Sequence, residues 1–186
     1  MAKNDIYQIK VTLNHSKPPI WRRLQVPANT RLDKLHSIIQ VAMGWWNAHL
    51  HQFIVGDTYI GELHPDYDMW GAEMLDEKKY RLNQIAPGEK TKFVYEYDFG
   101  DSWEHVILVE KILPPEPGVH YPRCIKGKRA GPPEDVGGIW GYEDFLEAIK
   151  DPKHPQHEAM LEWAGDDFDP EAFDMSGVNE ALEKLG

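Results

Sequence analysis

The sequence lacks several features that would assign it at once to a common class of protein. Among its 186 residues there is a single cysteine, Cys124, so an intramolecular disulfide is excluded, as expected for the reducing cytosol. No apolar stretch approaches the length that a membrane-spanning helix needs. The opening ten residues also lack the apolar segment of a signal peptide. The sequence therefore predicts a cytoplasmic protein without a membrane segment.

Motifs for nucleotide binding and for serine-type catalysis are also absent. The glycines form neither a Walker-type pattern nor a dinucleotide-binding pattern, and no serine stands in a nucleophile elbow. We also find no internal repeat. Because these motifs are missing, any chemistry must come from clusters of polar side chains.

Positive charge is scarce as well. The net charge is −11, and residues 151–186 contribute −8 of it, with 10 Asp and Glu against 2 Lys. A protein that binds duplex nucleic acid usually carries a basic surface, which this composition does not provide. Two local groups of cations remain, and each is either a nucleic-acid contact or an ordinary solvated surface. They are Arg22 and Arg23 in one segment, and Arg123, Lys126, Lys128 and Arg129 in another.

What the sequence does contain is the composition of an ordinary globular domain, with 41% hydrophobic and 27% charged residues. Its length favours one domain over the whole of residues 1–186. Within it we expect a sheet core over about residues 5–113, a long loop rich in Pro and Gly over 114–138, and an acidic helical part over 139–186.

The strands are expected where apolar side chains alternate. Residues 6–13 alternate strictly and predict a half-buried strand, with residues 20–26 as its hairpin partner. Two further short strands are expected over residues 49–61. Residues 62–90 are polar and irregular, with a short strand over 80–85.

One helix is expected early in the chain, because apolar side chains recur at helical spacing over residues 32–42. Thr30 and Asp33 stand three apart and predict a capping box at its start. Gly44 is the expected residue just beyond its end.

The centre of the chain predicts a β-hairpin, with the sequence FVYEYDFGDSWEHVILVEKI over residues 93–112. Its register decides the surroundings of His105. A two-residue loop places His105 opposite Glu96 or Asp98, and a three-residue loop places it opposite Tyr97 on the aromatic face. The sequence leaves these registers open. His105 is accordingly either a strand histidine bonded to a neighbouring acid or a metal ligand or general base.

A second pair of histidines suggests a metal site. His49 and His51 stand two apart in an expected strand, so both side chains would point to one face. Imidazoles at that spacing can share a divalent metal such as zinc, and solvent exposure is the alternative. The full candidate set is His49, His51 and His105, completed by Asp98, Asp101, Cys124 or Glu134.

The alternatives for the last three candidates are structural. Asp101 is in a turn, where aspartate commonly bonds the local backbone. Cys124 lies among cations that would lower the pKa of its thiol, but cysteine is also a common buried residue. Glu134 and the adjacent Asp135 are ligands or a cap for the helix that follows.

Three stretches together resemble the Ri-plasmid ORF-3-like family. They are the hairpin FVYEYDFGDSWEH, the opening segment YQIKVTLNHSKPPIWRRLQVPANTRLDKLHSIIQVAMGWWNAHLHQF, and YPRCIKGKRAGPPEDVGGIWGYEDFLEAI with the WAGDDFDPEAFD that follows. The resemblance spans roughly residues 5–180. It implies a family without an assigned activity that is often carried on plasmids and near transposons, so we expect a mobile-element association.

The order of elements predicts an α+β fold with a mainly antiparallel or mixed sheet, a central hairpin and C-terminal helices. Its ββαββ start is compatible with a β-grasp-like arrangement. Two functions remain. The first is a non-enzymatic binding module for a protein or a nucleic acid. The alternative is a metal-binding protein or metal-dependent hydrolase that uses His49, His51 and His105.

Overall fold

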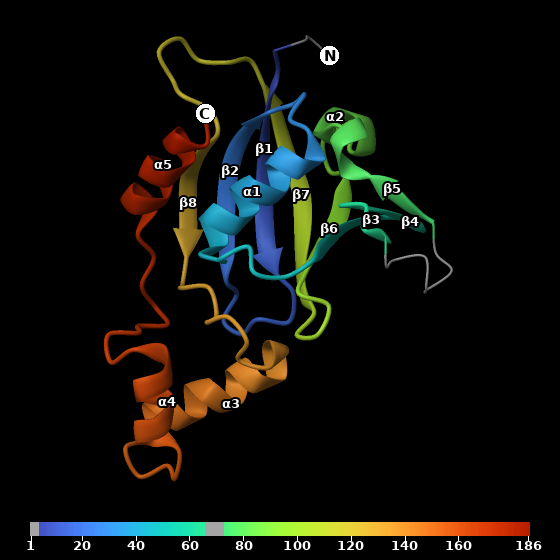
Figure 1. The fold of residues 1–186 in the computed structure, drawn as a ribbon. Helices are drawn as coiled ribbons and strands as arrows, with labels where there is room; N and C mark the ends of the chain where they lie inside the picture. Colours follow the sequence, from blue (N-terminus) through green and yellow to red (C-terminus); the bar gives the residue numbers. More distant parts are fainter. Residues whose placement is uncertain (1–3, 66–72) are drawn as a thin grey trace.

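The fold is given by a computed structural model that describes residues 4–65 and 73–186 (Figure 1). The strands are β1 Ile6–Leu13, β2 Trp21–Pro27, β3 His51–Val55, β4 Thr58–Gly61, β5 Met74–Asp76, β6 Lys92–Tyr97, β7 Trp103–Leu113 and β8 Arg123–Lys128. The helices are α1 Leu32–Met43, α2 Leu82–Ile85, α3 Gly138–Lys150, α4 His157–Ala164 and α5 Met175–Lys184, with a 3-10 turn η2 Glu77–Lys79.

The strands form one sheet in the order β5-β4-β3-β6-β7-β1-β2-β8. Neighbours are antiparallel except for β4 and β5, which run parallel. The predicted α+β class with a mainly antiparallel, mixed sheet is therefore confirmed. The predicted ββαββ order is present along the chain, and the β6–β7 hairpin separates its two strand pairs in the sheet.

Helix α1 lies across one face of the sheet and closes the core (Figure 1). Tyr7, Ile9 and Val11 in β1 are fully buried as predicted, whereas Ile6 and Gln8 on the opposite face are buried as well, so the strand is half-buried only from Lys10 onward. Residues at helical spacing in α1, among them Leu35 and Ile39, are buried against the same core. Burial of apolar area is the main stabilising term in such a two-layer arrangement.

The two ends of α1 differ from each other in how well the sequence predicts them. Gly44 ends the helix as expected, with φ +82° and its N–H bonded to the carbonyls of Gln40 and Val41. The predicted capping box at the start is wrong. The Thr30 hydroxyl donates instead to the Pro27 carbonyl at 2.6 Å, and Arg31 precedes the helix without a side-chain cap.

Two segments differ from their predicted form. The expected loop over 114–138 contains strand β8, which pairs with β2 at the edge of the sheet. The expected strand over 80–85 is the short helix α2, held to the start of α1 by backbone bonds between Leu82 N and Thr30 O and between Leu32 N and Tyr80 O. Part of the expected irregular stretch over 62–90, residues 66–72, lies outside the described residues.

Candidate metal centre

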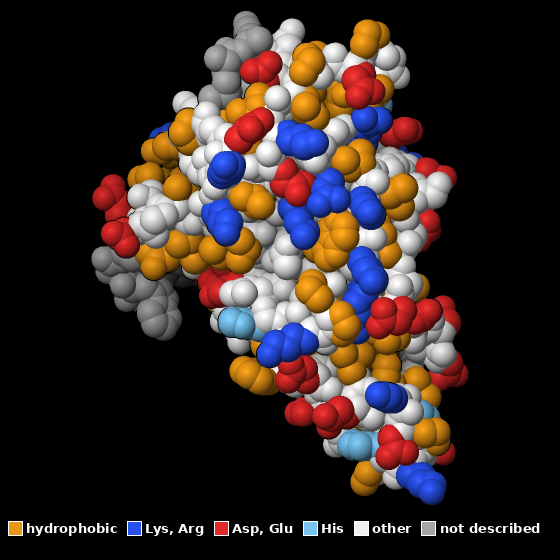
Figure 2. Space-filling view, turned by 180° about the vertical axis from the view of Figure 1, so that it is seen from behind, with side chains coloured by type: hydrophobic (Ala, Val, Ile, Leu, Met, Phe, Trp, Pro, Cys, Tyr) orange, Lys and Arg blue, Asp and Glu red, His pale blue; other side chains and the backbone are white. Residues whose placement is uncertain are grey.

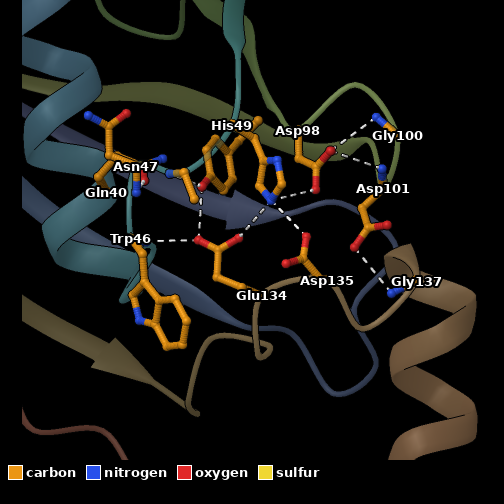
Figure 3. A network of polar contacts seen from close by, with 12 residues as sticks. Gln40, Trp46, Asn47, His49, Asp98, Gly100, Asp101, Glu134, Asp135 and Gly137 are labelled. Carbon is orange, nitrogen blue, oxygen red and sulfur yellow. Dashed lines mark hydrogen bonds and ion pairs between the residues drawn. The ribbon is translucent and has the colours of Figure 1, made fainter.

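Four polar side chains from three separate loops converge at one end of the sheet (Figure 3). His49 lies just before β3, Asp98 just after β6, and Glu134 and Asp135 in the loop before α3. We refer to these four residues as the His49 cluster. Its members lie far apart in the sequence, so only the fold brings them together.

The distances among His49, Asp98 and Asp135 suit a single ion, and Glu134 lies farther out in the cluster. His49 Nε2 lies 2.7 Å from Asp135 Oδ1, 3.5 Å from Asp98 Oδ2 and 3.8 Å from Glu134 Oε2. One ligand atom each from His49, Asp98 and Asp135 lies within 4.8 Å of the others. Ligand atoms that share a metal at about 2.0–2.2 Å lie at comparable separations from each other. Among the described residues, this is the group of His, Cys, Asp and Glu that meets that criterion.

Glu134 and Asp98 each have one carboxylate oxygen that accepts hydrogen bonds from the protein and a second oxygen that points into the cluster. Glu134 Oε1 accepts from the Trp46 N–H at 2.8 Å and from the Tyr97 hydroxyl at 2.9 Å. Asp98 Oδ1 accepts from the N–H groups of Gly100 and Asp101 at 3.1 and 3.3 Å. Such second interactions orient ligand atoms before an ion arrives. Glu134 Oε2 and Asp98 Oδ2 are the oxygens that face His49.

The atoms at the centre of the cluster are buried but not satisfied by hydrogen bonds. His49 Nε2 and Glu134 Oε2 are both buried and have no hydrogen-bond partner, although Asp135 Oδ1 is close to the nitrogen. The Glu134 side chain is only 3% exposed. An unpaired buried polar group costs about 1–3 kcal/mol, and more if it is charged. A cation that joins the cluster would give both atoms a partner.

The backbone around the cluster takes unusual conformations to position these groups. Asp98 and Asp135 both have φ +61°, and Asn47 has φ +52°. Aspartate and asparagine adopt this left-handed region more readily than other residues with a Cβ. The turn after Asp98 also supports the loop after Asp135, because Asp101 Oδ2 accepts from the Gly137 N–H at 3.1 Å.

Glycine is required where this loop meets the turn. A Cβ on Gly138 would lie 2.6 Å from the carbonyl oxygen of Asp101, and Gly138 has φ +72°. The close approach holds the loop that carries Glu134 and Asp135 against the β6–β7 turn that carries Asp98. Asp101, a predicted ligand, thus has a positioning contact in this structure.

The cluster opens to the surface on one side. A cavity of about 520 Å³ borders it and is lined in part by His49, Leu50, Asp98 and Phe99. Glu62 and Asp98 add acidic groups to its wall. A small molecule or water therefore has access to the face of the cluster that the protein does not cover.

His51 and His105 are not part of this cluster, so the expected convergence with His49 is not found. His51 Nε2 lies 2.7 Å from Glu77 Oε2, and its ring stacks on His36 with centroids 3.5 Å apart. His105 is fully buried, with Nδ1 3.0 Å from the Tyr95 carbonyl and Nε2 accepting from Trp45 Nε1 at 3.2 Å. β3 begins at His51, so His49 lies outside the strand. The expectation that residues two apart in a strand point to the same face therefore does not apply to this pair.

The hairpin register explains the position of His105. Tyr95 pairs with His105 and Tyr97 with Trp103, so residues 98–102 form the turn. This five-residue turn is longer than any of the three predicted loops. It places His105 on the buried aromatic face, as the three-residue loop would have done.

Cys124 lies apart from the His49 cluster. It is buried in β8, its N–H donates to Asn179 Oδ1 at 2.7 Å, and its Sγ lies 3.4 Å from the Lys126 carbonyl. Burial raises the pKa of its thiol, and the nearby Arg22 offsets only part of this effect. Burial therefore opposes the lowering of the thiol pKa that neighbouring cations would produce, and the position of Cys124 is that of a buried structural residue.

The predicted basic groups differ in how accessible they are. Arg22 and Arg129 are buried, and Arg129 bonds Glu171 and the Pro18 carbonyl. Arg23 forms a two-point ion pair with Glu110, and Arg123 donates to Gln25. Lys126 and Lys128 are exposed. On the side of the molecule opposite α1, Lys and Arg side chains lie among Asp and Glu (Figure 2).

The orienting donors Trp46 and Tyr97 were not identified from the sequence. Tyr97 is fully buried and accepts from the Ala48 N–H at 2.9 Å while it donates to Glu134. Burial raises the pKa of Tyr97 above its usual range, so the hydroxyl remains a donor. Aromatic alternation in β6 placed Tyr97 in the core, but no local pattern pairs it with a loop 37 residues away.

We expect the buried His105 to make the protein sensitive to mild acid. Burial lowers its pKa to about 4 from 6.5, so the unfolded chain binds a proton that the folded protein does not. Stability therefore falls as the pH drops from about 6.5 towards 4, by about 2 kcal/mol at pH 5. The measurement is urea unfolding at pH 8 and pH 5, together with an NMR titration of the ring.

The exposed His120 serves as the control. A His120→Gln variant should retain the acid sensitivity in the same urea unfolding measurements. A His105 signal that titrates above pH 6 in the folded protein would contradict the expectation.

Comparison with known proteins places the chain among relatives of similar length. The family model described as plasmid pRiA4b ORF-3-like protein matches residues 5–177. An uncharacterized protein, y4hQ, of Sinorhizobium fredii is 41% identical over 182 residues, which cover 97% of this chain and 92% of that protein. The crystal structure of a protein of unknown function, MM3350, from Methanosarcina mazei Go1 matches with a TM-score of 0.84 and 41% identity, over 94% of this chain and 98% of that one.

No helix in the described part is long and apolar enough to cross a bilayer. These relatives are described as proteins of unknown function, so the function must be inferred from the geometry of the His49 cluster.

Proposed function

The chain belongs to the plasmid pRiA4b ORF-3-like protein family, and we propose that it is a metal-binding protein that holds one divalent cation in the His49 cluster. The observation that carries this proposal is the burial of His49 Nε2 and Glu134 Oε2, which lack a hydrogen-bond partner although Asp135 Oδ1 lies 2.7 Å from the nitrogen. They face each other together with carboxylate oxygens of Asp98 and Asp135. A cation at this point would satisfy all four groups at once.

The donor set indicates which cations to expect. One imidazole and three carboxylates match Zn²⁺, Mn²⁺ or Fe²⁺, because imidazole suits zinc and iron and carboxylates suit manganese. Mg²⁺ and Ca²⁺ are less suited, since they favour sites made of oxygen ligands alone. We therefore expect the strongest binding for zinc or manganese.

The site would also support hydrolysis. A bound divalent metal lowers the pKa of a coordinated water molecule towards neutrality. The cavity beside His49 and Asp98 gives a second molecule access to that position. A metal-dependent hydrolase is consequently the enzyme class that this arrangement favours, with His49, Asp98, Glu134 and Asp135 as ligands rather than with His51 and His105.

A role in nucleic-acid binding has less support from the same structure. Two of the six predicted cations, Arg22 and Arg129, are buried, and Arg23 is neutralised by Glu110. Phosphate contacts need exposed Lys and Arg side chains. The exposed Lys126 and Lys128 alone make a small basic surface on a chain of net charge −11.

Metal titration of chelator-treated protein tests the proposal. Isothermal calorimetry with ZnCl₂ and MnCl₂ should show one saturable site per chain. The His49→Ala variant should bind at least about 100-fold more weakly, because loss of an outer-shell partner alone costs 10- to 100-fold. The matched control is His120→Ala, which removes an exposed histidine outside the cluster.

The outcome depends on the comparison of these two variants. A site that is lost in His49→Ala and retained in His120→Ala supports the proposal. Absence of saturable binding, or equal affinity in the two variants, would refute it.

A further inference from the structure

Helices α3 and α4 form an arm that lies beyond the end of the sheet (Figure 1). We define the α3–α4 arm as residues 138–167. Phe145 of the arm packs edge-on against Trp163 and against Phe168, which directly follows the arm, with ring centroids 6.0 and 5.4 Å apart. Helix α4 has no fully buried residue, so its outer surface faces solvent.

A cavity of about 380 Å³ lies between the two helices of the arm. Its apolar lining comes from Val136, Phe145, Met160 and Trp163, and Asp144 and Gln156 lie among the polar lining groups. Trp163 is 49% exposed, although it lines the cavity. Exposed tryptophan beside a cavity is typical of the anchors on which protein interfaces depend.

The arm is strongly acidic. Residues 138–167 hold eight Asp and Glu against two Lys, a net charge of −6. Asp144 on α3 and Glu162 on α4 are both exposed. This field attracts cationic groups and repels anionic ones over the range of a Debye length, about 10 Å at moderate salt.

We propose that the α3–α4 arm is a docking surface for a basic segment of another protein, in which Lys or Arg residues flank one apolar side chain. The apolar side chain enters the cavity beside Trp163, and the cations face Asp144 and Glu162. An amphipathic segment of this kind is a common mode of peptide recognition. The opposite charges speed the encounter and set the orientation.

The negative charge of the arm disfavours a second copy of the chain, a nucleic acid or an anionic lipid surface as its partner. A second copy of this chain would bring another arm of net charge −6 against the first. Nucleic acids and anionic lipid surfaces are repelled for the same reason. A cationic protein segment is the partner whose charge complements the arm.

The test uses synthetic peptides and fluorescence anisotropy on the full-length protein. The probe is a fluorescein-labelled 14-residue peptide in which Lys residues flank a single central Leu, and its counterpart carries Glu in place of Lys. We expect the Lys peptide to bind and the Glu peptide not to bind. Raising NaCl from 50 to 300 mM should weaken the Lys peptide about 10-fold or more, because screening shortens the reach of the acidic field.

Two matched pairs of variants locate the binding. Trp163→Ala should weaken the Lys peptide about 10-fold or more, whereas Trp140→Ala, which removes a 74% exposed tryptophan of the same arm, should not. The double variant Asp144→Asn/Glu162→Gln should weaken it about 5-fold. Its control, Glu180→Gln/Glu183→Gln on α5, removes the same charge elsewhere and should leave affinity nearly unchanged.

Several results would overturn the proposal. Equal losses in the two double variants would mean that the overall charge of the chain attracts the peptide. Binding of the Glu peptide, or equal affinity of the two tryptophan variants for the Lys peptide, would show that the arm is not the binding site. A dimer in light scattering that disappears in Trp163→Ala would identify a second copy as the occupant.

Discussion

Replacing Glu134 by glutamine is expected to stabilise the metal-free protein and to remove most of its stabilisation by metal. Glutamine retains the oxygen that accepts from Trp46 and Tyr97. Its amide group takes the position of Oε2, the buried oxygen without a hydrogen-bond partner that lies 3.8 Å from His49 Nε2. The change removes one of several crowded negative charges, so we expect a gain of about 1 kcal/mol.

The same substitution removes a metal ligand. At a free metal concentration 100 times the dissociation constant, the natural protein gains about 2.7 kcal/mol of stability. A variant that binds 100-fold more weakly gains only about 0.4 kcal/mol under the same conditions. Urea unfolding in chelator and in excess ZnCl₂ or MnCl₂ measures both quantities, and Glu180→Gln on the exposed face of α5 is the control.

Replacing Glu134 by alanine should have the opposite effect on the metal-free protein. It leaves the Trp46 N–H and the Tyr97 hydroxyl without their acceptor and creates a cavity, which costs about 1–3 kcal/mol or more. If the glutamine variant is stabilised by metal as strongly as the natural protein, Glu134 is not a ligand. If glutamine destabilises the metal-free protein as much as alanine does, the crowding of charges is not significant.

The sequence predicted those parts of the fold that depend on local periodicity. Alternation in residues 6–13 and 93–97 gave the strands β1 and β6, and helical spacing gave α1, because these patterns repeat within one element. Strand β8 was missed because Gly127 and several cations interrupt any alternation. Its strand structure depends on pairing with β2, about 100 residues earlier in the chain.

The candidate site was predicted only in part, because long-range contacts also decide which of its residues meet. His49, Asp98 and Glu134 were among the proposed ligands, but they were grouped with His51 and His105, which lie elsewhere in this structure. The length of the β6–β7 turn determines on which face of β7 His105 lies, and the sequence did not determine that length. The loop with Glu134 and Asp135 reaches His49 only through contacts such as Asp101 with Gly137.

Arg22 shows the same difficulty for a single side chain. In the sequence it stands beside Arg23 and looks like a surface cation. In the structure it is 2% exposed, its Nε donates to the Ala42 carbonyl at 2.7 Å, and its Nη1 donates to the carbonyls of Trp21 and Lys128. The guanidinium also lies 3.9 Å over the ring of Phe173. Three of these partners come from distant segments, so the sequence gives no sign of them.

Substitution of Arg22 by alanine is therefore expected to destabilise the fold severely. Arg22 links β2 to the last turn of α1, to β8 and to the segment before α5. Burial lowers its pKa to about 10, which still leaves it protonated at neutral pH. Its charge is stabilised by carbonyl dipoles, including one at the negative end of a helix. Losing these contacts and opening a cavity should cost about 3–5 kcal/mol.

The adjacent Arg23 provides the matched control, because Arg23→Ala removes the same side chain from the same strand. Arg23 pairs with Glu110 on the partly exposed face, and such pairs contribute about 0–1 kcal/mol. Arg22→Lys should give an intermediate loss, since an ammonium group lacks the fork that reaches several carbonyls at once. Urea unfolding followed by circular dichroism measures all three variants. Similar losses in the free energy of unfolding for Arg22→Ala and Arg23→Ala would contradict a structural role for Arg22. Arg22 would then again be a candidate surface cation for nucleic-acid contact, as the sequence first predicted.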